Sequence, residues 1–283
     1  MRNKILNYVF ISSSLLLSRF SLATIHRFGA VFGVFFHWLK PKTKVLLIQN
    51  LKQSALFKDD ESLKNAIQLN IHETGKTMLE SLVIWGSSQH RVLSWIKAIH
   101  HIEIITEAVD KKKGIIFITP HIGAYEVASI YYASQRPITI LYRPARKLWM
   151  NTLITSGRSK GQIKLAPTTL AGVKKLFVAL KNGEAVGILP DQIASKGEGE
   201  WANFFGKPMY TMVLASKLAK KTGAVVVMVV AERLAEGKGF VLHLESLAQD
   251  SIGNVNLLNQ QVELQIKKFP LQYMWNYNRY KQP

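Results

Sequence analysis

The 283-residue sequence contains no cysteine. This excludes disulfide bonds, thiolate metal ligands and a cysteine nucleophile. It leaves the redox compartment undetermined, because cysteine-free chains occur in oxidising and reducing compartments alike. Any covalent chemistry would therefore have to use another nucleophile.

Acidic residues are few: 18 Asp and Glu stand against 37 Lys and Arg, which gives a formal net charge of +19. The first acidic residue is Asp59, so residues 1–58 carry only positive charge at neutral pH. This excess attracts an anionic partner, either nucleic acid, acidic lipid or an acidic carrier protein. Charge alone does not choose among these partners.

Two apolar runs near the N-terminus fall short of the ~20 residues that a helix needs to cross a bilayer. They are "ILNYVFISSSLLL" from Ile5 to Leu17 and "FGAVFGVFFHWL" from Phe28 to Leu39. With flanking cations at lipid headgroups, they predict membrane-associating helices over residues 1–45. Two alternatives stay open. One is a signal peptide cleaved at "SLA" (21–23), against which Arg19 argues, and the other is a buried helical hairpin.

Residues 46–283 show no internal repeat and no low-complexity linker. Helical spacing of apolar residues predicts a packing helix over 61–85. From Gly114 onward, runs rich in Ile and Val alternate with helical segments that end in Gly183 and Gly223. The runs are "GIIFIT", "PITILY", "AVGILP" and "AVVVMVV". This alternation predicts an α/β domain with a largely parallel sheet flanked by helices.

The stretch "TPHIGAYE", residues 119–126, places a histidine just after the first of these strands. On one continuous helix, His121 and Glu126 would point about 140° apart. We therefore expect His121 on a strand-to-helix turn, with Glu126 in the next helix reaching back to one imidazole nitrogen. A histidine held in this way is suited to act as a general base. The alternative is that His121 caps the helix and Glu126 only favours its N-terminus.

Further elements follow in a specific order: "YRPAR" with Asn151 and Arg158 downstream, "LPDQ" at 189–192, "FFGKPMYT" at 204–211 and "PLQYMWNYNRYK" at 270–281. Together with "HIGAYE" they resemble the lipid A biosynthesis acyltransferases of Gram-negative bacteria, the lauroyl and myristoyl transferase family. The apolar N-terminus followed by "LIQNLK" also matches that family's layout, so the resemblance covers nearly the whole chain. The tail departs from the pattern, because "YNRYK" has an asparagine where a histidine or arginine is expected before the final arginine.

The resemblance implies transfer of an acyl chain from acyl carrier protein to a hydroxyl of a lipid A precursor, at the cytoplasmic face of the inner membrane. It implies contact with membrane lipids. It implies no metal ion, no cofactor and no nucleic-acid partner. Attack on a thioester creates an oxyanion that needs donors placed in advance. Arg158 is the favoured donor, and Arg146 and the backbone N–H groups at the start of the helix after His121 are further candidates.

The remaining candidates concern substrate binding. Arg143, Arg146 and Asn151 are expected to contact the substrate, with Arg143 on its phosphates. Asp191 and Gln192 are expected to orient the sugar or His121, unless the aspartate only closes a turn. The aromatic stretch "WANFFG" is expected to line an acyl pocket, unless it is plain core.

Two rival functions stay open from the sequence. One is an acyltransferase acting on another glycolipid or a glycerophospholipid. The other is a non-enzymatic basic protein that binds membrane or nucleic acid, which would have no buried histidine–carboxylate pair. For the enzyme we expect direct transfer without an acyl-enzyme intermediate, since Thr119 is the only hydroxyl residue immediately beside His121 and it precedes a proline.

Overall fold

The structure is a computed structural model that describes residues 2–145 and 147–283. Four helices come first: α1 Arg2–Leu17, α2 Leu22–Leu39, α3 Pro41–Ser54 and α4 Asp60–Gly86. The other helices are α5 Gln89–Ser94, α6 Glu103–Asp110, α7 Glu126–Ala133, α8 Leu148–Arg158, α9 Leu170–Lys181, α10 Leu214–Thr222 and α11 Val255–Lys268. The strands are β1 Ile96–His100, β2 Ile115–Ile118, β3 Ile138–Tyr142, β4 Ile163–Pro167, β5 Ala185–Ile188, β6 Gly199–Phe204, β7 Lys207–Met212, β8 Val225–Arg233 and β9 Phe240–Leu247.

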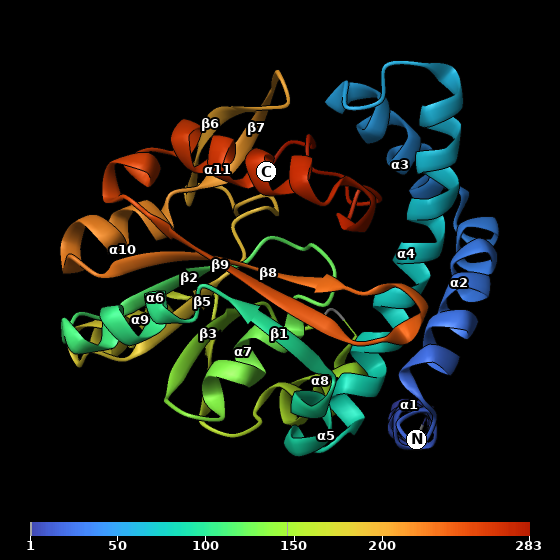
Figure 1. Ribbon diagram of the computed structural model, residues 1–283, viewed down its shortest axis with the longest axis horizontal. Helices are drawn as coiled ribbons and strands as arrows, with labels where there is room; N and C mark the ends of the chain where they lie inside the picture. Colours follow the sequence, from blue (N-terminus) through green and yellow to red (C-terminus); the bar gives the residue numbers. More distant parts are fainter. Residues whose placement is uncertain (1, 146) are drawn as a thin grey trace.

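A seven-stranded sheet forms the centre of the molecule, in the order β1-β9-β8-β2-β5-β3-β4 (Figure 1). Strands β8, β2, β5, β3 and β4 are parallel, whereas β9 pairs antiparallel with β8. The predicted α/β fold with a largely parallel sheet is confirmed. Strands β6 and β7 form a separate antiparallel hairpin, which the sequence analysis did not foresee.

Hydrophobic cores lie on both faces of the sheet, as expected for strands with near-continuous apolar sequences. On one face, alternate side chains of β2 and β8 pack with α9, α10 and α11. On the other face, the remaining side chains pack with α5, α6 and α7. In β2 all four residues are buried, which explains why "GIIFIT" shows no polar alternation.

The N-terminal helices lie at one end of the domain, where α2 runs along α4 (Figure 1). The two helices touch backbone to backbone through glycines: a Cβ on Gly75 would lie 2.0 Å from the Gly29 oxygen and 2.3 Å from the Gly33 nitrogen. The inner face of α2 also buries His26, whose Nε2 lies 2.9 Å from Oε2 of Glu80 on α4. The expected boundary at residue 45 falls inside α3.

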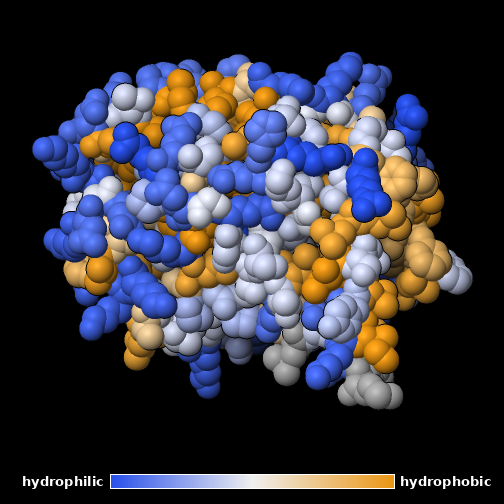
Figure 2. Space-filling view, turned by 90° about the horizontal axis from the view of Figure 1, so that it is seen from below, coloured by the Kyte–Doolittle hydropathy of each residue, from blue (hydrophilic) through white to orange (hydrophobic). Residues whose placement is uncertain are grey.

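The outer face of α2 remains exposed. Among the described residues, α2 is the one helix that is long and apolar enough to cross a membrane. Its exposed side chains include Phe28, Val31, Phe35 and Trp38, of which Trp38 is 73% exposed. Figure 2 shows apolar surface gathered at the end of the molecule where α1 and α2 lie, while the opposite end is mostly hydrophilic. The helix thus has one face for the protein and one apolar face towards its surroundings.

Candidate active site

His121 and Asp191 meet because two neighbouring parallel strands end in the same way. Ile118 of β2 pairs with Ile188 of β5, and each strand is followed by one residue, a proline and then the functional residue. His121 and Asp191 each stand three residues beyond this pair, so both lie at the same point on the carboxyl edge of the sheet. This edge is where open α/β sheets bind ligands.

The carboxylate of Asp191 holds His121 in two ways. Oδ1 lies 2.8 Å from the imidazole Nδ1, and Oδ2 accepts the backbone N–H of His121 at 3.0 Å. Burial raises the pKa of Asp191, but the charge and hydrogen bonds of His121, together with the Arg279 guanidinium, outweigh burial and bring the pKa to about 2. Asp191 is therefore an anion at neutral pH and fixes the orientation of the ring.

The other imidazole nitrogen faces the cavity. With Nδ1 donating to Asp191, Nε2 keeps its lone pair and accepts from the side-chain amide of Gln192 at 3.2 Å. The Gln192 amide thus occupies the direction from which a substrate hydroxyl would offer its proton. The His121 side chain is 11% exposed, so solvent and substrate can reach it. This tautomer is the one required of a general base.

Glu126 lies elsewhere than we expected from the sequence. Its carboxylate accepts from Nε of Arg158 at 2.9 and 3.1 Å and from one terminal nitrogen at 2.5 Å, rather than from His121. Among the described residues, no hydrogen bond joins His121 to Glu126. The expected contact of Glu126 with the imidazole is thus corrected: Asp191 holds the ring of His121, and Glu126 holds an arginine.

The Glu126–Arg158 pair joins the first turn of α7 to the last residue of α8. Arg158 also lies over the indole ring of Trp85, 5.7 Å from its centroid. Burial lowers the pKa of Arg158, but the neighbouring Glu126 outweighs burial and raises it. The guanidinium is thus a permanent cation whose plane is fixed from two sides. Since both Arg158 and His121 line the same cavity, Arg158 is positioned to stabilise negative charge near the base.

The backbone N–H groups of His121 and of the three residues after it, which lie before α7, are already bonded within the protein. Those of Ile122, Gly123 and Ala124 donate to Pro120, Gln272 and Ala231 respectively, and that of His121 donates to Asp191. A donor already committed to the protein offers little to a developing charge. Arg158, which lines the same cavity, and the start of α7 stay the candidates for this role.

A cavity of about 310 Å³ lies beside His121, between the sheet and α7. Its polar end includes His121, Arg143, Arg158 and Gln192. Its interior is mainly apolar and is lined by residues such as Phe117, Ile138, Ile140, Gly187, Val229 and Leu244. An apolar cavity with a few convergent polar groups is the usual form of a small-molecule site.

The other predicted substrate-binding residues differ in their positions. Arg143 is exposed, lines the cavity and donates to Oγ of Ser195 at 2.9 Å. Asn151 accepts the Ala145 backbone N–H at 2.8 Å, so it shapes the segment after β3. Arg146 lies outside the described residues.

The expectation that "WANFFG" lines an acyl pocket is wrong. These six described residues, 201–206, lie outside the cavity lining and belong to β6 and the turn that follows it. Phe204 and Phe205 are buried in the core on the opposite face of the sheet. The cavity beside His121 lies instead between β2, β3, β5 and α7, within runs that we had interpreted only as strands.

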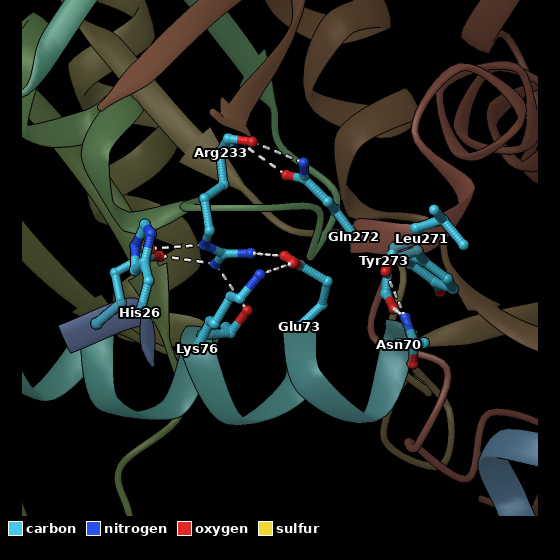
Figure 3. A network of polar contacts seen from close by, with 10 residues as sticks. His26, Asn70, Glu73, Lys76, Arg233, Leu271, Gln272 and Tyr273 are labelled. Atoms are coloured by element: carbon cyan, nitrogen blue, oxygen red, sulfur yellow. Dashed lines mark hydrogen bonds and ion pairs between the residues drawn. The ribbon is translucent and has the colours of Figure 1, made fainter. Parts of the chain in front are cut away.

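The turn that carries His121, residues 119–125, is held in place by the C-terminal segment 270–281, to which the sequence alone gave no role. The Met274 N–H donates to the His121 carbonyl, and the Gly123 N–H donates to the Gln272 carbonyl. On the other side of this segment, the Asn70 amide bonds the carbonyls of Leu271 and Tyr273 at 2.7 and 2.9 Å (Figure 3). The segment therefore connects α4 to the catalytic turn.

A buried ionic network continues this bracing. Arg233, at the end of β8, bonds Glu80 and Glu73 of α4 through its side chain, while the Gln272 side chain bonds its backbone N–H and C=O (Figure 3). Because His26 of α2 bonds the same Glu80, the network links the apolar N-terminal helix to the site. In the sequence His26 lies between the two apolar runs, beside Arg27, and nothing local to it indicates this link.

Serine chemistry does not fit the site. The pattern GxSxG occurs at residues 157–161, but Ser159 is exposed and follows the helix α8. A nucleophile elbow instead joins a strand to a following helix. Within the described residues, no group of three or more His, Asp or Glu side chains is arranged to hold a metal ion. The chemistry of the site therefore centres on His121.

A base, a fixed cation and an apolar cavity together suit transfer of an acyl chain to a hydroxyl. The sequence matches the family described as "Bacterial lipid A biosynthesis acyltransferase" over residues 4–282. It is 24% identical over 264 residues to the lipid A biosynthesis lauroyltransferase of Escherichia coli (strain K12), covering 91% of this chain and 85% of the relative. It is 25% identical over 227 residues to the palmitoleoyltransferase of the same organism, covering 78% and 73%.

A lipid A biosynthesis acyltransferase of Haemophilus influenzae is 23% identical over 268 residues, which cover 91% of this chain and 84% of the relative. These matches agree with the order of motifs along the chain and with the site. The chain belongs to the bacterial lipid A biosynthesis acyltransferase family and is an O-acyltransferase.

Proposed function

We propose that the protein transfers a fatty acyl chain from acyl carrier protein to a hydroxyl of a lipid A precursor, at the cytoplasmic face of the inner membrane. Membership of the family supports the reaction class and the lipid A pathway. The observation that carries the proposal is the imidazole of His121, which is fixed by a buried carboxylate and whose Nε2 faces an apolar cavity, where the Gln192 amide holds the place of the acceptor hydroxyl. A non-enzymatic basic binder has no need of this arrangement.

In the proposed reaction, Nε2 of His121 takes the proton of the acceptor hydroxyl as its oxygen attacks the thioester carbon. The negative charge that develops on the carbonyl oxygen faces Arg158. Collapse of the tetrahedral intermediate expels the thiolate of the donor, which takes the proton from the imidazolium. Asp191 stabilises that imidazolium, as the carboxylate does in serine-hydrolase triads.

Transfer is direct in this proposal. The chain has no cysteine, and Thr119 is buried before Pro120 at the end of β2. Donor and acceptor must then be bound together, so initial rates should show intersecting reciprocal plots. Mass spectrometry of the enzyme with donor alone should show unmodified protein, and an acyl adduct that chases into product on adding acceptor would contradict direct transfer.

The membrane supplies the acceptor, and the N-terminal helices provide the means of reaching it. The outer face of α2 exposes apolar side chains, and exposed Lys40, Lys42 and Lys44 follow directly after it. Apolar area together with flanking cations favours the surface of anionic lipid. An acidic carrier protein would likewise be attracted by the net charge of +19.

To test the proposal, the purified protein is incubated with a tetra-acylated lipid A precursor and with acyl carrier protein that carries acyl chains of different lengths. The mass of the product is then measured by mass spectrometry. We expect addition of one acyl chain. The rival is transfer to another lipid, for which the geometry of His121 would serve equally well. A panel that includes lysophospholipid acceptors separates the two, because turnover only on lysophospholipid would overturn the lipid A assignment.

A further inference from the structure

Arg279 lies deep in the protein beside the acid that holds the base. Its side chain is 3% exposed, and one terminal nitrogen lies 3.8 Å from Oδ2 of Asp191, which is 2% exposed. The same nitrogen donates to the Tyr273 hydroxyl. The guanidinium carbon lies 3.6 Å from the centroid of the Phe204 ring. An arginine is almost never buried to this extent without a partner for its charge.

Two asparagines from other elements fix the segment that carries this arginine. Asn70 bonds the carbonyls of Leu271 and Tyr273, and Asn50 of α3 bonds those of Trp275 and Tyr277 at 2.7 and 2.9 Å. Every second carbonyl from Leu271 to Tyr277 is therefore held by helices α3 and α4. The position of Arg279, two residues further on, follows from this anchoring.

We propose that Arg279 is a positioning residue: it is the counter-ion of Asp191, keeping that carboxylate ionised and aimed at His121. The two carboxylate oxygens of Asp191 have different partners. Oδ1 bonds the imidazole, while Oδ2 bonds the backbone of His121 and faces the guanidinium. A cation on Oδ2 balances the buried anion without competing for the hydrogen bond to the ring. The effect of Arg279 on Asp191 agrees with the lowered pKa of that acid.

This role explains why the tail can depart from the expected pattern before its last arginine. The neighbouring Asn278 is exposed, whereas Arg279 points into the protein. Only the second position carries the charge that Asp191 needs. The surroundings hold no second anion in contact with Arg279 among the described residues, so the pair is specific.

Other charges around the site bear on its pH dependence. Several titratable groups surround Asp191 or its direct neighbours. The turn and α7 contribute His121, Tyr125 and Glu126, and the ends of α8 and β3 contribute Arg158 and Arg143. The C-terminal segment contributes Tyr273, Arg279 and Tyr280. Glu126 and Arg158 neutralise one another. Apart from the imidazole of His121 itself, Arg279 is thus the cation that acts on Asp191 in the described part of the chain.

The first test measures stability and does not depend on the proposed function. Arg279→Gln leaves Asp191 buried without its counter-ion, and the variant should unfold several degrees lower than the wild type. Adding Asp191→Asn removes the unpaired anion, so the double variant should unfold at a higher temperature than Arg279→Gln alone. If Arg279→Gln does not fold, the double variant should recover folded protein. A double variant no more stable than the single one would overturn the proposal, because lost packing is not rescued in this way.

The second test uses the acyl-transfer assay and so rests on the proposed function. Loss of the cation favours the protonated base, so in Arg279→Gln the midpoint of the acid limb of the rate profile should move up by about 0.5 to 1 pH unit. Arg279→Lys keeps the charge and should stay close to the wild-type midpoint. An unchanged midpoint in Arg279→Gln with only a uniform loss of rate would contradict the role. A wild type that is inactive on all acyl acceptors would instead count against the proposed function.

Discussion

Asp191 and His121 stand three residues beyond Ile188 and Ile118, which pair across the parallel strands β5 and β2. Their 2.8 Å contact therefore follows from sheet register, not from proximity along the chain. Seventy residues separate the two in sequence. The contact requires that β2 and β5 end at paired residues, so it depends on the register of the sheet.

The first prediction concerns acid stability. The folded pKa of Asp191 is about 2, below the ordinary value of 3.8, so the ionised form is favoured in the folded state. Its stabilisation is fully present above pH 4 and is lost as the pH falls through 2, and it amounts to about 2 kcal/mol. We expect the free energy of unfolding of the wild type to exceed that of Asp191→Asn at pH 5, and the difference to shrink between pH 4 and 2. A difference that stays constant over this range would contradict the account.

The second prediction separates the two carboxylates. Glu126→Gln should lower kcat by about ten- to a thousandfold through Arg158, without moving the acid midpoint of the rate profile. Arg158→Gln should cost a similar factor, and the double variant should lose little more, because the two residues act as one unit. If Glu126→Gln moved the acid midpoint, then Glu126 would contact the base during turnover.

Much of the fold could be predicted from the sequence, because β2, β3, β5 and β8 are apolar runs bounded by turn residues. His121 could also be placed on its turn, since Pro120 ends the strand. The sequence offered Glu126, and Asp191 with Gln192, as candidates to orient His121, but it could not decide between them, because strand order determines which carboxylate reaches the ring. Nothing local to "HIGAYE" or "LPDQ" says that β2 and β5 are neighbours, whereas HxxxxE suggests a partner nearby in the chain.

The role of Arg279 was hidden for a similar reason. Its charge suggests a surface residue, and its burial depends on long-range contacts to Phe204, Tyr273 and Asp191. The acyl cavity was also missed, because its walls are strand residues whose apolar character is explained equally well by a solid core. Only Gly187, a glycine inside the buried run "AVGILP", carried a local signal of space beside a strand.

The third prediction concerns acyl length. Gly187 lines the cavity, and a Cβ there would make ordinary contacts of 3.5 Å with Ile140 and 3.7 Å with Ile138. Gly187→Ala should therefore fold and fill part of the cavity, shifting the preferred donor to a shorter chain. Each buried methylene is worth about 0.8 kcal/mol, so the preference should change about fourfold per carbon lost. Val186→Ala lies on the same strand but faces the other core, and it should leave the length profile unchanged. An equal loss of turnover with donors of every chain length in Gly187→Ala would contradict the role of the cavity in selecting acyl length.

The fourth prediction concerns the outer face of α2. Val31 and Trp38 are 70% and 73% exposed, so Val31→Ser with Trp38→Ser should weaken sedimentation with anionic vesicles while turnover in detergent persists. Leu170→Ser, which alters a 91% exposed leucine on α9, is the matched control and should sediment normally. Point substitutions are sharper than deleting residues 1–45, because the deletion also strips His26 from Glu80. Undiminished vesicle binding by the double variant would place membrane attachment elsewhere.

The central claim, that His121 is the base of acyl transfer, is tested most directly by the turnover of His121→Ala on charged acyl carrier protein and a tetra-acylated lipid A precursor. Removing a general base typically costs two to four orders of magnitude in rate. We therefore expect a loss of about 100- to 10,000-fold in kcat, with vesicle binding intact, since no residue of α2 lines the cavity beside His121. Turnover of His121→Ala near the wild-type rate would contradict the mechanism.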